Sequence, residues 1–154
     1  MKILTRILLA TLLALPMAIT AHARTAVPIV NHDKVTWSRA DGKQLDLPAV
    51  RSAITQAATS KTWSVENGPG DNTLIAKLLM HNKHTINVTI TYSSTAFSVN
   101  YLSSINMKYA VEEDSPEVDP LSSKKNLGRH EVIHPNYNKW VQELVSAIQT
   151  NLSH

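Results

Sequence analysis

The sequence predicts an α+β fold in which an antiparallel meander sheet of three or four strands has an N-terminal and a C-terminal helix packed on one face. Apolar and polar residues alternate over residues 62–101, which is typical of strands with one buried face. Short polar or glycine-containing connections separate these strands, as antiparallel neighbours allow. The segments on either side repeat apolar residues every three or four positions, which is the period of a helix.

The first expected helix covers residues 46 to about 59. Asp46 has the short polar side chain that caps a helix N-terminus, and Pro48 is tolerated in a first turn. Its apolar residues recur at steps of three and four: Leu47, Val50, Ile54 and Ala57 or Ala58. Residues 24–45 are expected to be an extended N-terminal segment, so that residues 46–154 make the single α+β domain.

Strands are expected over residues 62–66, 73–81, 85–93 and 97–101. The alternation is clearest in the third, where one side carries Ile86, Val88, Ile90 and Tyr92. The C-terminal helix is expected from about residue 136 to 151. Its apolar residues recur at steps of four: Trp140, Leu144, Ile148 and Leu152. Packing both helices on the apolar side of the sheet gives a two-layer sandwich.

Residues 111–129 are expected to form a polar loop between the last strand and the last helix. Acidic residues come first and basic residues follow, while Pro116 and Pro120 interrupt regular structure. This pattern favours a solvated loop. A calcium site is the alternative, but the acidic run lacks the spacing and the central glycine of a calcium-binding loop.

The first 23 residues have the pattern of a cleavable secretory signal peptide. Lys2 and Arg6 form a positive start, residues 7–19 are almost entirely apolar, and Ala21-His22-Ala23 supplies the small residues of a cleavage site. An uncleaved membrane anchor is the alternative, but a spanning helix needs about 20 apolar residues. We therefore expect export to the periplasm of a Gram-negative bacterium, with release to the medium as the alternative.

The composition excludes several classes of function. The chain has no cysteine, so it forms no disulfide and carries no lipid on a cysteine. The formal net charge of +3 falls to +1 when Lys2 and Arg6 leave with the signal, which gives no electrostatic case for nucleic acid or an anionic membrane. There is no G-x-S-x-G sequence and no glycine-rich phosphate loop. No cofactor is expected.

Residues 130–134, His-Glu-Val-Ile-His, match the H-E-x-x-H pattern of zinc hydrolases. That chemistry needs a helix, because one helical turn places both imidazoles on the same zinc ion. Pro135 disfavours a helical conformation at His134, so an extended chain is expected here instead. A wider alternative is a zinc or copper site that combines His130 and His134 with His81 and His84, which flank a short connection between strands.

The stretch from Ile133 to Val141, Ile-His-Pro-Asn-Tyr-Asn-Lys-Trp-Val, resembles the C-terminal signature of a family of small uncharacterised bacterial envelope proteins. In that family an I-H-x-x-Y-N-x-W stretch opens the last helix. Residues 104–109, Ser-Ile-Asn-Met-Lys-Tyr, are similar to the segment that ends the last strand of its members. Many members carry a lipid-anchor cysteine, which this chain lacks. The resemblance implies no activity, but it supports reading His134 as a loop or cap residue.

Two interpretations of this signature remain open. In the structural one, Tyr137 and Trp140 anchor the last helix on the sheet, and an asparagine or His134 caps it. In the functional one, a recognition surface gathers where the last strand meets the last helix, from Asn106, Tyr109, His134, Asn136 and Tyr137.

The sequence therefore favours an exported, non-enzymatic binding or accessory module of the cell envelope. Its expected partner is another envelope protein or a small ligand. The alternatives are a periplasmic zinc- or copper-binding protein and an H-E-x-x-H metallohydrolase. The oligomeric state is not predicted.

Overall fold

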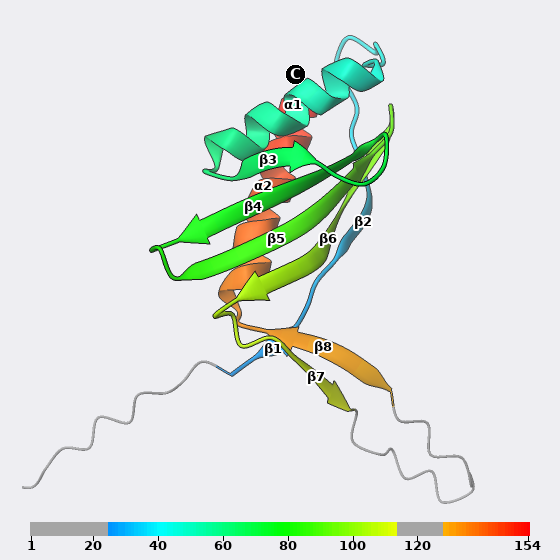
Figure 1. The fold of residues 1–154 in the computed structure, drawn as a ribbon. Helices are drawn as coiled ribbons and strands as arrows, with labels where there is room; N and C mark the ends of the chain where they lie inside the picture. The colour runs from blue at the N-terminus through cyan, green and yellow to red at the C-terminus, as the bar shows by residue number, and fades with distance from the viewer. Residues whose placement is uncertain (1–24, 114–127) are drawn as a thin grey trace, which may run out of the picture.

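The computed structural model describes residues 25–113 and 128–154. It contains two antiparallel sheets and two helices within these residues, which confirms the α+β class (Figure 1). The expected signal peptide, residues 1–23, lies outside the described part of the chain. None of the helices in that part has the length and apolar character needed to span a membrane.

The larger sheet has five strands in the order β2-β6-β5-β4-β3, and all neighbours are antiparallel. Its members are β2 (His32–Thr36), β3 (Ser64–Asn67), β4 (Thr73–Met80), β5 (His84–Tyr92) and β6 (Ala96–Ile105). The four strands from β3 to β6 form the predicted meander. The fifth strand, β2, comes from the N-terminal segment and pairs with β6, so the sheet is larger than the sequence predicts.

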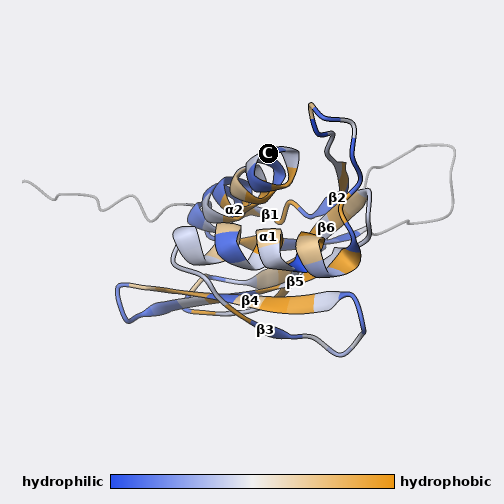
Figure 2. Cartoon of the chain, turned by 90° about the horizontal axis from the view of Figure 1, so that it is seen from above, coloured by the Kyte–Doolittle hydropathy of each residue, from blue (hydrophilic) through white to orange (hydrophobic). Residues whose placement is uncertain are grey.

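Both helices cover the same face of this sheet, as the two views show (Figures 1 and 2). They are α1 (Leu47–Ser60) and α2 (Asn136–Ser153). The alternating residues of the strands and the stripes of the helices meet in one core, in which Ile54, Val88 and Leu144 are completely buried. We call the five-stranded sheet with its two helices the body.

The predicted start of the first helix is confirmed in detail. An Asp46 side-chain oxygen accepts a hydrogen bond of 2.8 Å from the backbone N–H of Ala49, and Pro48 lies in the first turn. This bond satisfies one of the N–H groups that a helix N-terminus leaves without a partner.

A second, smaller sheet extends beyond the end of the body (Figure 1). It has the order β1-β8-β7, with β1 (Val27–Pro28), β7 (Ala110–Glu113) and β8 (Arg129–Ile133). We call the pair of strands β7 and β8 the arm.

The arm corrects the prediction of a polar loop over residues 111–129. Residues 111–113 belong to β7 and Arg129 belongs to β8, while residues 114–127 lie outside the described residues. The prediction failed because it treated charged side chains as a sign of irregular backbone. In a two-strand arm, backbone pairing sets the structure, and charged side chains are tolerated because solvent reaches them.

Candidate functional site

The predicted recognition residues lie near the junction of β6, the arm and α2. The backbone N–H of His134 donates a hydrogen bond of 2.7 Å to the carbonyl oxygen of Met107, which joins the start of α2 to the turn after β6. Met107 is 2% exposed, so this turn is packed into the core and is not a loose connection. Residues far apart in the sequence therefore meet here in a fixed arrangement.

His134 has a structural role at the start of α2. Its Nδ1 accepts a hydrogen bond of 3.1 Å from the backbone N–H of Asn136, and its carbonyl oxygen accepts one of 2.9 Å from Tyr137. Pro135, the residue before the first helical position, makes no side-chain cap. The imidazole therefore supplies the acceptor that a serine or aspartate supplies at other helix starts.

Three tyrosines form a cluster at the same place. Tyr137 is completely buried, and the Tyr101 ring meets it edge-on with ring centres 5.5 Å apart. Tyr109 stacks on Tyr101 with ring centres 5.1 Å apart and an interplanar angle of 10°. Tyr109 is the exposed member, with 42% of its surface open to solvent. Such stacks hold their outer ring in a defined orientation.

A carboxylate completes this cluster. The Tyr109 hydroxyl donates a hydrogen bond of 2.6 Å to Oε1 of Glu131, and this bond is the main reason that the pKa of Tyr109 is raised. Burial is the main reason that the pKa of Tyr137 is raised, and Tyr101 and Glu131 add to the effect. Both shifts favour the neutral phenol, so the Tyr109 hydroxyl remains a hydrogen-bond donor to Glu131.

The Tyr137 hydroxyl is buried without a hydrogen-bond partner in the described structure. A buried polar group of this kind costs free energy. Most of the Tyr137 side chain nevertheless acts as an apolar anchor for α2, as the structural interpretation of the signature requires. Trp140 is partly buried and packs against the same core.

Asn138, another residue of the signature, holds the N-terminal segment. Its amide oxygen accepts a hydrogen bond of 3.0 Å from the Val30 backbone N–H, and its amide nitrogen donates one of 2.9 Å to the Pro28 carbonyl oxygen. The side chain thus pairs with extended backbone as a neighbouring strand would. This role depends on a contact across more than 100 residues, so the sequence did not reveal it.

Asn106 is tied to the turn between β4 and β5 instead. It has a positive φ of 58°, its side-chain amide donates a 2.7 Å hydrogen bond to the Lys83 carbonyl oxygen, and its own carbonyl accepts one of 2.8 Å from Nδ1 of His84. Asparagine tolerates this left-handed conformation better than most residues. These bonds give Asn106 a role in holding the turn, apart from the tyrosine cluster.

The H-E-x-x-H residues lie on an extended strand, as Pro135 predicts. Residues 130–133 belong to β8, and Glu131 points to the opposite side of the strand from His130. Nε2 of His130 lies 3.7 Å from Oε2 of Glu112 on the neighbouring strand. The helical geometry of a zinc hydrolase is therefore not formed.

No group of three or more histidine, aspartate or glutamate side chains within residues 25–113 and 128–154 is arranged to hold a metal ion. The four histidines of the alternative metal site have separate surroundings. His84 bonds the Asn106 carbonyl oxygen, His134 caps α2, and His130 faces Glu112. His81 lies in the turn after β4 with a positive φ of 53°.

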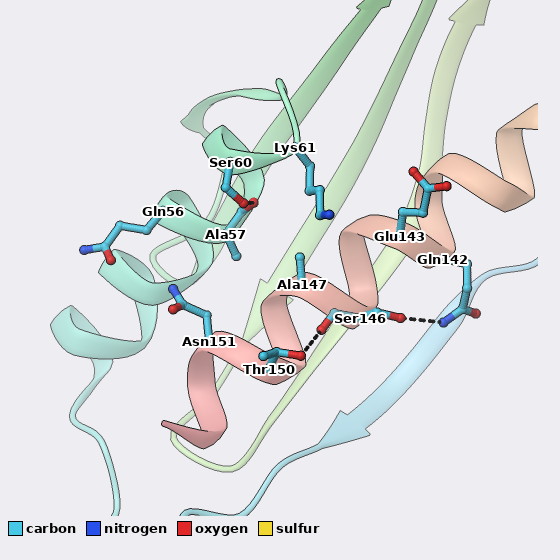
Figure 3. Close-up of a pocket in the computed structure, with 10 residues that line it drawn as sticks. All are labelled: Gln56, Ala57, Ser60, Lys61, Gln142, Glu143, Ser146, Ala147, Thr150 and Asn151. Atoms are coloured by element: carbon cyan, nitrogen blue, oxygen red, sulfur yellow. Dashed lines mark hydrogen bonds between the residues drawn. The ribbon is translucent and has the colours of Figure 1, made fainter.

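A shallow groove of about 680 Å³ lies between α1 and α2 (Figure 3). Polar side chains line most of it, and several of them bond within their own helix, such as Gln142 to Ser146 and Thr150 to the Ser146 carbonyl. The Asn151 amide crosses to the Ala53 carbonyl oxygen of α1. These polar groups are satisfied by the protein itself, which is typical of an ordinary interhelical surface.

Comparisons with protein-family models, with curated proteins and with solved structures found no match for this chain. The residues that the sequence did not single out for this site are Tyr101 and, as the partner of Tyr109, Glu131. Alternation placed Tyr101 on the apolar side of its strand, and Glu131 was considered only within the H-E-x-x-H pattern. Their contact with Tyr109 depends on how the arm is placed relative to β6, which residue spacing does not show.

Proposed function

We propose that this protein is an exported, non-enzymatic binding module of the cell envelope that contacts its partner through one face of the arm. This arm face consists of Val111 and Glu131 of the arm together with Tyr109, the residue directly before β7. Export follows from the signal-peptide pattern at residues 1–23. The body acts as the scaffold on which the arm is held.

The observation that carries this proposal is a large aromatic ring that is both exposed and fixed. Tyr109 is held by its stack on Tyr101 and by its hydrogen bond to Glu131, yet 42% of it faces solvent. Val111 is 50% exposed and lies directly opposite Glu131 in the arm. Tyrosine is enriched at protein interfaces, and a side chain that is already ordered loses little entropy on binding.

The surface chemistry favours binding over catalysis. The arm face offers an aromatic ring, an aliphatic side chain and a carboxylate. The Tyr109 hydroxyl bonds to the Glu131 carboxylate, but this bond raises the pKa of the phenol, which is the opposite of what an activated nucleophile needs. Several polar groups in the interhelical groove are bonded within the protein, so the groove offers a weaker case for a ligand than the arm.

Site-specific photocrosslinking in intact cells tests this function. A photoreactive amino acid replaces Ala110, an exposed residue of the edge strand β7 whose side chain lies on the opposite side of the strand from Val111, so the label adjoins the arm face without replacing any of its side chains. Matched controls replace Lys77, on the face of the five-stranded sheet away from the helices, and Gln56, in the interhelical groove. We expect one defined crosslinked species from position 110 and none from the controls.

Two results would contradict the proposal. Crosslinking from position 56 or 77 but not from 110 would move the binding surface away from the arm. Failure to crosslink from all three positions, with correctly folded and exported protein, would argue against a binding module.

A further inference from the structure

We propose that β7 accepts an extended, basic segment of another envelope protein as an additional strand. This inference rests on the proposed function and specifies the chemistry of the partner. It begins from the position of β7, which is the outermost strand of the small sheet in the described part of the chain. All four of its residues, Ala110–Glu113, are exposed.

The edge of β7 differs from the other sheet edges of the described residues. The β1 edge carries Pro28, which has no N–H to donate. The β2 edge has an irregular register between His32 and Val35, and Lys34 lies there with a positive φ of 51°. The β3 edge packs beneath α1 (Figure 1). Such features keep an edge from pairing with another chain.

The β7 edge has a regular backbone instead. It contains no proline, and its register with β8 is continuous from Ala110 opposite Val132 to Glu113 opposite Arg129. A regular edge strand presents a row of backbone donors and acceptors, which is the feature that peptide-binding domains use in strand addition. Backbone geometry at β7 therefore suits an extended partner of about four residues.

The charge of the arm selects the kind of partner. Its two strands carry three carboxylates, Glu112, Glu113 and Glu131, against Arg129 and His130. The arm is therefore net negative whether or not the histidine is protonated. A second copy of β7 would bring two more glutamates to the same edge, and like charges on adjacent strands are destabilising. A segment with lysine or arginine would gain from the same charges.

Alternating side chains would place basic residues on both faces of the arm. Val111 and Glu131 share one face, and Glu112 lies on the other. A basic residue on the first face would also lie near the exposed Tyr109 ring. Cations are attracted to the face of such a ring.

The test uses an acetylated and amidated hexapeptide, Arg-Arg-Val-Val-Arg-Arg, as the probe, because neighbouring arginines of an added strand point to opposite faces of the arm. Titration is followed by the backbone amide signals of the isotopically labelled mature chain. We expect the largest shifts at residues 110–113. A peptide with glutamate in place of arginine, and arginine peptides N-methylated on alternate residues in each of the two frames, serve as probe controls. At least one N-methylated frame should fail to bind, because it lacks the N–H groups that pair with β7.

Variants of the arm test the role of charge. The Glu112→Gln, Glu113→Gln double variant should bind the arginine peptide about tenfold more weakly, since exposed ion pairs each contribute up to about 1 kcal/mol. Glu143→Gln, an exposed change on α2, removes a charge outside the arm and should leave the affinity unchanged. The Glu112→Lys, Glu113→Lys variant should prefer the glutamate peptide.

The outcomes separate this inference from the proposed function. If the arginine peptide does not bind while position 110 still crosslinks in cells, the arm binds a partner of other chemistry and this inference fails alone. If both N-methylated peptides bind as well as the parent, strand addition is contradicted. If neither peptide binding nor crosslinking occurs, both proposals fail.

Discussion

The body and the arm are built on different physical principles. In the body, the inward side chains of the sheet and of both helices meet in one core, and residues such as Ile54, Val88 and Leu144 are completely buried. In the arm, backbone pairing joins two strands whose side chains are mostly exposed. The comparison teaches that the core does not depend on the exposed apolar residue of β7, so the recognition that we propose for the arm can be tested apart from stability.

The largest expected effect is on the free energy of unfolding, and it compares a substitution in the body with one in the arm. Leu144→Ala in the body should lower the free energy of unfolding by about 2 to 5 kcal/mol, because it leaves a cavity in a packed core. Val111→Ala in the arm should change it by less than about 0.5 kcal/mol. Urea unfolding of both variants measures the difference. Similar losses from the two substitutions would show that the arm is part of the cooperative core.

A smaller loss of stability is expected from a substitution where the N-terminal segment joins the body. Asn138→Ala removes the hydrogen bonds to Val30 and Pro28 and should cost about 1 to 2 kcal/mol. Amide hydrogen exchange should accelerate at Val30. Gln142→Ala, which loses only a bond within α2, serves as the control and should change stability by less than about 0.5 kcal/mol. Equal effects from both variants would contradict the role given to Asn138.

Removal of the Tyr137 hydroxyl should change the free energy of unfolding in the opposite direction. Tyr137→Phe removes a buried polar group that has no partner in the described structure, so it should increase the free energy of unfolding by about 1 kcal/mol. Thermal and urea unfolding both report this gain. A loss of stability would show that the hydroxyl has a partner, such as a bound water molecule.

The smallest expected effect concerns the dependence of stability on pH. Burial lowers the pKa of His32, while the neighbouring Asp33 acts in the opposite direction. The unfolded chain therefore binds a proton more readily than the folded one, so this histidine contributes full stability above its unfolded pKa of about 6.5 and loses it as pH falls through the lower folded value. His32→Gln should flatten the dependence of stability on pH between about 7.5 and 5. The same slope in the variant and in wild type would contradict this assignment.

Local patterns predicted most of the body. The Asp46 cap and the buried stripe of Val50 and Ile54 follow from spacing alone, as does the inward side of β5. Leu47, the first apolar residue of the expected stripe, is 38% exposed because it lies at the helix end. Elements whose contacts are close in sequence were therefore the ones that the sequence revealed.

The pairing of elements with distant partners was not predicted. The strand β2 is short, polar and irregular, and its pairing with β6 brings together residues 60 or more positions apart. The arm strands carry charges that resemble those of a loop. Strand formation at such places is decided by the neighbouring strand more than by the residues themselves.

The candidate site was predicted only in part, because some of its contacts also join residues that are far apart in the sequence. The signature brought Tyr109 and Tyr137 to attention, and both lie in the tyrosine cluster. The spacing of residues could not show that Tyr101 lies between them or that Glu131 accepts the Tyr109 hydroxyl. Asn106 and His134 have hydrogen bonds that explain their presence structurally.

The most direct test of the central claim separates binding from folding in one protein. The Val111→Arg variant, with the photoreactive residue at position 110, places a positive charge on the arm face. If the arm is the binding element, the free energy of unfolding should stay within about 0.5 kcal/mol of its parent, while the yield of crosslinked partner should fall by about tenfold or more. An undiminished crosslinking yield in the folded variant would contradict the claim that the arm face binds the partner.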